Sequence, residues 1–168
     1  MGQRYLIALG SNRRHRRHGP PRAVLAAAHA ALEQAGIAVN GFSPVVASRP
    51  LGPSDRTYAN AVAAVTAPFD PPELLARLKR IEAQFGRRPG GRRWAARVLD
   101  LDLVLWEGGC WAGPGLIVPH PAFRDRAFVL APAQRGVGFW RDPLTGLSLR
   151  HLHARLTRPR PVPKPPHT

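Results

Sequence analysis

Apolar positions recur along the chain with two alternating periods, one typical of strands and the other of helices. Short apolar or alternating runs predict strands at residues 5–9, 37–47, 58–67 and 98–106. Apolar residues that recur every three or four positions predict helices at 24–35 and 70–85. Asp70 is a candidate N-cap for the second of these helices, and glycines at 36 and 86 are natural stops.

The order strand, helix, strand, strand, helix, strand predicts an α+β fold, the ferredoxin-like βαββαβ sandwich. In this fold one sheet face packs on two helices, and we expect the other face to be free for binding. A short helix at about 125–131 extends the framework as a C-terminal extension. We expect one domain over 1–157, and a disordered tail over the Pro-rich, basic residues 158–168.

The last predicted strand carries two carboxylates, Asp100 and Asp102, in an otherwise apolar run. Side chains at i and i+2 of a strand share a face, so the two acids are predicted to lie side by side. The opposite face is predicted to carry the leucines, Leu99, Leu101, Leu103 and Leu105. Unpaired charges among apolar neighbours are costly, and Mg²⁺ prefers carboxylate oxygens completed by substrate phosphates. The alternative is a solvated acidic pair on a half-exposed strand.

The chain carries a net charge of +15, most of it from arginine. Such a field attracts nucleotides, RNA or DNA, although an arginine-rich composition would produce the same excess without a function. No run is long enough to span a bilayer, and the short apolar N-terminal run does not resemble a signal peptide. The single cysteine, Cys110, excludes an intrachain disulfide, which fits a reducing compartment. From these observations together we expect a cytoplasmic protein without a membrane partner.

Short motifs follow one another in a fixed order along the chain: Leu9–Asn12, Pro50–Pro53, Tyr58–Ala61, Arg80–Glu82, Arg92–Trp94, Arg97–Asp102, Pro119–Pro121 and Arg126–Leu130. In this order and spacing the chain, from Tyr5 to about Leu156, resembles the 6-hydroxymethyl-7,8-dihydropterin pyrophosphokinase family. These folate-pathway enzymes move a pyrophosphoryl group from ATP to a pterin alcohol. The resemblance implies ATP and this pterin as partners, and a monomer is expected. The chain departs from the family pattern at Ser54–Thr57 and at Ala95–Ala96.

The resemblance also implies roles for single residues. Two Mg²⁺ ions would be held by Asp100 and Asp102, and the charge that develops during transfer would be stabilised by Arg87 and Arg97. The implied ATP-binding residues are Glu82, Arg87, Trp94, Arg97, His120 and Arg126. The implied pterin-binding residues are Leu51, Tyr58, Asn60, Trp94, Asp100 and Phe128, with Tyr58 and Phe128 as aromatic walls.

Each of the less specific assignments has a structural alternative. Glu82 sits at the edge of the apolar stripe of its helix, where a border salt bridge with Lys79 is the alternative. Trp94 is alternatively a core or surface aromatic, Phe128 a core residue of the short helix, His120 a turn histidine and Asn60 a strand-end cap. The alternative for the whole chain is a diverged, catalytically weak member that binds RNA or another polyanion. A nucleic-acid partner is not expected, because no Lys/Arg-Gly-Phe/Tyr run is present, but the charge does not exclude one.

Overall fold

The structure is a computed structural model that describes residues 2–49, 56–86 and 98–159. Its strands are β1 (Gln3–Ser11), β2 (Ala38–Phe42), β3 (Val46–Ser48), β4 (Tyr58–Ala67), β5 (Asp100–Trp106), β6 (Trp111–Gly113) and β7 (Leu116–Val118). Its helices are α1 (Pro21–Gln34), α2 (Pro71–Gln84), the 3₁₀ turn η1 (Phe123–Asp125), α3 (Ala127–Gly136) and α4 (Leu149–Thr157). The predicted α+β order is confirmed.

The main sheet has the strand order β2-β4-β1-β5, with antiparallel pairing throughout. This order is the ferredoxin-like arrangement, in which β1 lies between β4 and β5. The strand predicted at 37–47 is divided into β2 and β3, both of which pair with β4. Pro44 lies at the break and has no N–H to donate to a ladder. Ser43 replaces the lost pairing, because its hydroxyl accepts from the Val62 N–H at 2.9 Å.

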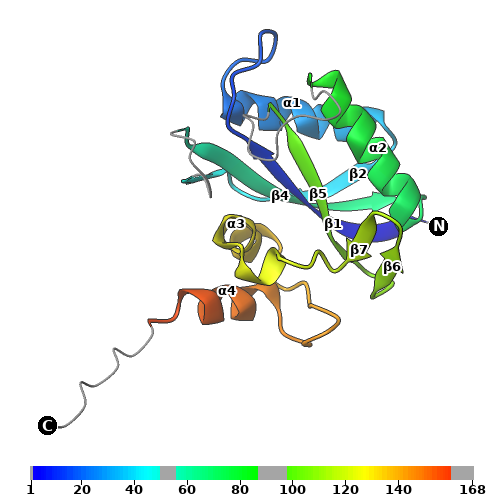
Figure 1. The fold of residues 1–168 in the computed structure, drawn as a ribbon, viewed down its shortest axis with the longest axis vertical. Helices are drawn as coiled ribbons and strands as arrows, with labels where there is room; N and C mark the ends of the chain where they lie inside the picture. The colour runs from blue at the N-terminus through cyan, green and yellow to red at the C-terminus, as the bar shows by residue number, and fades with distance from the viewer. Residues whose placement is uncertain (1, 50–55, 87–97, 160–168) are drawn as a thin grey trace, which may run out of the picture.

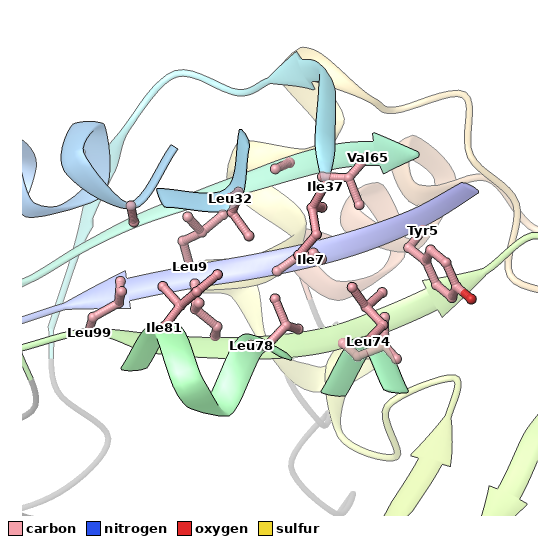
Figure 2. Close-up of a cluster of buried hydrophobic side chains, with 14 of the residues drawn as sticks. Tyr5, Ile7, Leu9, Leu32, Ile37, Val65, Leu74, Leu78, Ile81 and Leu99 are labelled. Carbon is pink, nitrogen blue, oxygen red and sulfur yellow. The ribbon is translucent and has the colours of Figure 1, made fainter. Parts of the chain in front are cut away.

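Helices α1 and α2 cover one face of the sheet, and the larger apolar core lies between them and β1, β4 and β5. Figure 2 shows Leu32 of α1 and Leu78 of α2 directed toward Leu9 and Ile7 of β1. Alternation places every second β1 side chain on this face, and the helical stripe of α2 meets it. Asp70 caps α2 as predicted, since its side chain accepts from the Glu73 N–H at 2.9 Å.

Helices α3 and α4 lie on the opposite side of the sheet from α1 and α2 (Figure 1). They bury a second apolar cluster, which includes Leu6 of β1, Val62 of β4 and Leu130 of α3. The expectation that this face is free for binding is therefore wrong over much of its area. The short helix predicted at about 125–131 is instead η1 followed by a longer α3.

One predicted side-chain orientation in β5 is also wrong. Leu99, Leu101 and Leu103 face the larger core, whereas Leu105 faces the second cluster together with Val104. The pairing register between β5 and β1 shifts at this point, as it does at a β-bulge. A β-bulge reverses the alternation of side chains beyond it. Within the described part of the chain, no helix has the length and apolarity needed to cross a membrane. Residues 160–168 of the predicted disordered tail lie outside the described residues.

Candidate active site

The floor of the candidate site is the sheet face at the end where β5 begins. In the pairing register Gly10 of β1 stands opposite both Asn60 of β4 and Asp100 of β5. Ala8, two residues earlier, stands opposite Asp102. Side chains directly opposite one another share a face, so these residues form two adjacent rows. The small residues of the central strand thus separate Asn60 from the two acids.

Asp102 lies beside Asp100 on this face, as the spacing of the two acids predicts. The Asp102 side chain is 32% exposed, and its Oδ2 lies 3.6 Å from Nη1 of Arg126 in an ion pair. Burial raises the pKa of Asp102, and the neighbouring Asp100 raises it further, against the opposing effects of His120, Lys79 and Arg126. A second acid and partial burial therefore make a bound cation favourable at this position.

Glu82 of α2 is completely buried, whereas the sequence predicts a carboxylate at the edge of the apolar stripe. Its Oε1 accepts from the Leu101 N–H at 2.7 Å and lies 3.2 Å from Nζ of Lys79. β5 is an edge strand, so its outward N–H groups need partners from elsewhere. Because Leu101 stands between Asp100 and Asp102, Glu82 holds the backbone that carries both acids. Its predicted contact with ATP stays a prediction.

His120 follows the cis peptide bond between Val118 and Pro119. Its N–H donates to the Val104 carbonyl at 2.9 Å, and its Nδ1 accepts from the Ala122 N–H at 3.2 Å. The neutral ring then carries its proton on Nε2. Burial lowers the pKa of His120, although the Asp102 carboxylate opposes this shift. The turn is thus a structural one, as the alternative predicted, and it also brings His120 into electrostatic interaction with both acids.

Arg126 and Phe128 reach this face from the start of α3. The Arg126 guanidinium carbon lies 5.6 Å from the centroid of the Phe128 ring, and the same guanidinium pairs with Asp102. Phe128 also packs against the second apolar cluster, so its inner edge is part of the core. Helix α3 therefore places one cation and one aromatic ring beside the acids.

Tyr58 and Asn60 reach the same face from β4. A Cβ built on Gly10 would lie 3.4 Å from Asn60 Oδ1 and 3.9 Å from Tyr58 Cδ1, so all three line one space. Asn60 is 4% exposed, and its Nδ2 donates to Ser48 Oγ at 2.7 Å. This contact fixes the amide in the strand pair β3–β4, and the predicted contact of Asn60 with the pterin stays a prediction.

Four residues predicted for the site, Leu51, Arg87, Trp94 and Arg97, lie outside the described residues, and their roles stay predictions. Within the described residues, no group of three or more His, Cys, Asp or Glu side chains could by itself hold a metal. A pair of carboxylates completed by water and phosphate oxygens suits Mg²⁺. The sequence analysis missed Ala8 and Gly10, although small residues at i and i+2 of a strand indicate a close approach to one face.

Known proteins are similar to this chain in sequence and in fold. The model of the 7,8-dihydro-6-hydroxymethylpterin-pyrophosphokinase (HPPK) family matches residues 6–135. The chain is 41% identical over 134 residues to a Pseudomonas aeruginosa 2-amino-4-hydroxy-6-hydroxymethyldihydropteridine pyrophosphokinase, covering 79% of each protein. A Synechocystis protein of the same name is 36% identical over 118 residues, which cover 70% of this chain and 60% of that protein. The chain thus spans less than two thirds of the Synechocystis relative.

Solved structures share the fold. The Plasmodium falciparum HPPK-DHPS wild type with pteroate superposes with a TM-score of 0.69 at 11% identity, over 92% of this chain and 42% of that chain. The same protein with pterin and p-hydroxybenzoate gives a TM-score of 0.70 at 12% identity, with the same coverage. At these identities the likeness shows the fold alone, whereas the family model and the curated relatives extend over most of the chain. The chain belongs to the HPPK family.

Proposed function

We propose that this chain transfers a pyrophosphoryl group from ATP to 6-hydroxymethyl-7,8-dihydropterin and releases AMP, as a step in folate synthesis. The observation that carries the proposal is the pair of rows on the sheet, in which Asn60, Gly10 and Asp100 lie across three strands and Asp102 lies beside them. A flat heterocycle and a polyphosphate need different neighbours. This face offers an amide and an aromatic ring on one side, and two carboxylates on the other.

Asp100 and Asp102 would hold the magnesium, and we propose two ions as the resemblance implies. Mg²⁺, when bound, neutralises phosphate charge and orients the reacting groups. The two acids share a face, and burial together with Asp100 raises the pKa of Asp102, which supports a bound cation there. Arg126 pairs with Asp102 at 3.6 Å, a length that leaves this guanidinium able to turn toward a phosphate.

Tyr58 and Phe128 would contact the two faces of the pterin ring, while Asn60 would hydrogen-bond its edge. Aromatic contacts of this kind contribute on the order of 1 kcal/mol beyond the buried area. An amide offers both a donor and an acceptor, as a pterin edge does. Asn60 is already held by Ser48, so its orientation is set before the substrate binds. Preorganisation of this kind lowers the entropy cost of binding.

The direct test is AMP formation from ATP by the purified protein in the presence of Mg²⁺, with and without the pterin alcohol. We expect AMP release only when the pterin is present. Asp100→Ala and Asp102→Ala should each abolish turnover and leave the circular dichroism spectrum unchanged. Asp125→Ala, which removes an exposed acid at the end of η1, is the matched control and should retain activity.

Activity close to that of the wild type in either Asp100→Ala or Asp102→Ala would overturn the metal assignment. A folded wild-type protein that releases no AMP would overturn the proposed activity. The polyanion-binding alternative would then gain support if RNA bound with an affinity that falls steeply with salt and ignores both substitutions.

A further inference from the structure

The loop between β1 and α1 carries a cluster of exposed arginines that the site described above does not use. Residues 13–19, called here the basic hairpin, contain Arg13, Arg14, Arg16 and Arg17. All four arginine side chains are exposed. The backbones of His15 and Gly19 exchange two hydrogen bonds, at 2.8 and 2.9 Å, which close the loop as a hairpin.

Two histidines fix the hairpin to the end of α2. His15 Nδ1 accepts from the backbone N–H groups of Arg17 and His18, both at 3.1 Å. The rings of His15 and His18 stack at 4.6 Å, and His18 stacks in turn on Phe85 at 5.0 Å. Phe85 is buried at the C-terminus of α2 and belongs to the larger core. The arginines are therefore presented from a backbone with a defined position.

That position is close to the metal-binding acids. Gly10 stands opposite Asp100, and Arg13 follows only three residues later. The Cα atom of Arg13 thus lies within about 11 Å of that of Gly10, because a chain extends at most about 3.6 Å per residue. Figure 1 shows the hairpin rising beyond the end of the sheet at which β5 begins. The Debye length is about 8 Å at physiological ionic strength and about 30 Å at about 0.01 M salt, so charges at this range interact most strongly when the salt concentration is low.

The charge of the hairpin is not neutralised by nearby acids. Within residues 2–49, 56–86 and 98–159, the ion pairs involve Arg4, Arg77, Lys79, Arg124 and Arg126. No hairpin arginine takes part in them. We propose that the basic hairpin attracts the triphosphate of ATP to the adjacent acids, so that it increases ATP affinity and capture without taking part in the transfer step. This inference rests on the proposed function of the site.

A general excess of surface charge is the competing explanation, and charge-matched variants separate the two. R13Q/R14Q/R16Q/R17Q removes four positive charges from the hairpin. R135Q/R150Q/R155Q/R158Q removes four from exposed positions in the second half of α3 and on or beside α4, away from the hairpin. Dissociation constants for MgATP and steady-state constants are measured for both variants from about 10 mM to about 1 M salt, where the Debye length falls from about 30 to about 3 Å.

At low salt we expect the hairpin variant to raise both the Kd and the KM for MgATP by about tenfold, the lower end of electrostatic steering effects. Its kcat and its KM for the uncharged pterin should not change, and the difference in ATP affinity should vanish at high salt. The control variant should stay within about twofold of the wild type under the same screening. Equal losses in both variants, or a loss that does not depend on salt, would overturn the inference.

A third variant tests the electrostatic origin and guards against misfolding. R13K/R14K/R16K/R17K keeps the charge, so its ATP affinity should match that of the wild type. If this variant loses affinity as the glutamine variant does, the hairpin acts through guanidinium geometry or loop structure and the proposed capture is wrong.

AMP release separates the two proposals. A wild type without AMP release, but with hairpin-dependent MgATP binding, would contradict the proposed function alone, whereas normal AMP release with unchanged ATP affinity in the glutamine variant would contradict the inference alone.

Discussion

Replacing Glu82 by alanine removes the acceptor for the Leu101 N–H, which lies between Asp100 and Asp102, the two proposed metal ligands. The Leu101 N–H, bonded to Glu82 at 2.7 Å, would be left buried without its partner. An unsatisfied buried donor costs about 1–3 kcal/mol. Glu82 is completely buried, so the substitution also removes the packed Cγ methylene, worth about 0.8 kcal/mol.

The ion pair with Lys79 adds little, because the Lys79 side chain is 44% exposed. Pairs screened by solvent in this way contribute at most about 1 kcal/mol. The sum for Glu82→Ala is therefore a loss of about 2–4 kcal/mol in the free energy of unfolding. Glu82→Gln retains a carbonyl oxygen that can accept from Leu101, so we expect it to lose only about 1 kcal/mol.

Urea denaturation at neutral pH, followed by circular dichroism, measures both losses from the transition midpoint and the slope. Glu73→Ala on the same helix is the control, since the Glu73 side chain is 52% exposed and its pair with Arg77 lies at the surface. A second measurement is the Mg²⁺ concentration needed for half-maximal AMP release. It should rise for Glu82→Ala more than for Glu82→Gln, because only the alanine variant releases the backbone between the acids.

Equal stability of Glu82→Ala and Glu82→Gln would contradict the argument, because it would mean that the Leu101 N–H does not depend on this acceptor. A loss within about 0.5 kcal/mol of the wild type for Glu82→Ala, the range typical of surface substitutions, would contradict it as well. If stability falls as expected but the Mg²⁺ requirement does not change, Glu82 supports the fold without positioning the acids.

Two further predictions follow from other parts of the structure. Gly10→Ala places a methyl group 3.4 Å from Asn60 Oδ1, which is an ordinary contact, so thermal stability should stay close to that of the wild type. The KM for the pterin, measured from steady-state AMP release, should rise because the methyl group enters the space that Asn60 and Tyr58 line. An unchanged KM for the pterin would mean that Gly10 does not line the pterin site. Burial alone would raise the pKa of Asp142, but hydrogen bonds from Arg124 and Thr145 outweigh it, and the folded pKa is lowered from 3.8. The stabilisation is therefore complete above the unfolded pKa and is lost as the pH falls through the folded value. Asp142→Asn should lower the free energy of unfolding by about 3 kcal/mol at neutral pH, the lower end for a broken buried pair, and by much less in acid. Urea denaturation between about pH 7 and pH 2 measures both losses. An equal loss at both pH values would show that the Asp142 carboxylate is not the source of the stabilisation.

Much of the fold could be predicted from the sequence, because its signals are local. The helical stripe of α2 and the cap at Asp70 depend on residues within a few positions of one another. The same holds for the shared face of Asp100 and Asp102, which follows from the two-residue period of a strand. The order of these elements was then enough to select the βαββαβ arrangement.

Other features depended on neighbours that are distant in the chain. Leu105 turns away from the other leucines because the register between β1 and β5 shifts, which the β5 sequence alone does not encode. Asn60 is held by Ser48 across the β3–β4 pair. The second apolar cluster exists because α3 and α4 return to cover a face that the main sheet would otherwise expose.

The sequence by itself determined helices α1 and α2 and most of the main-sheet strands, the pairing of the two acids on one face and the family to which the chain belongs. Only the tertiary structure decided that Gly10 separates Asn60 from Asp100, that Glu82 supports the backbone of Leu101, and that the basic hairpin rests on Phe85. The physical reason is the range of the interactions. Hydrophobic period and capping act over a few residues, whereas buried hydrogen bonds and ring contacts join segments that only the packed sheet brings together.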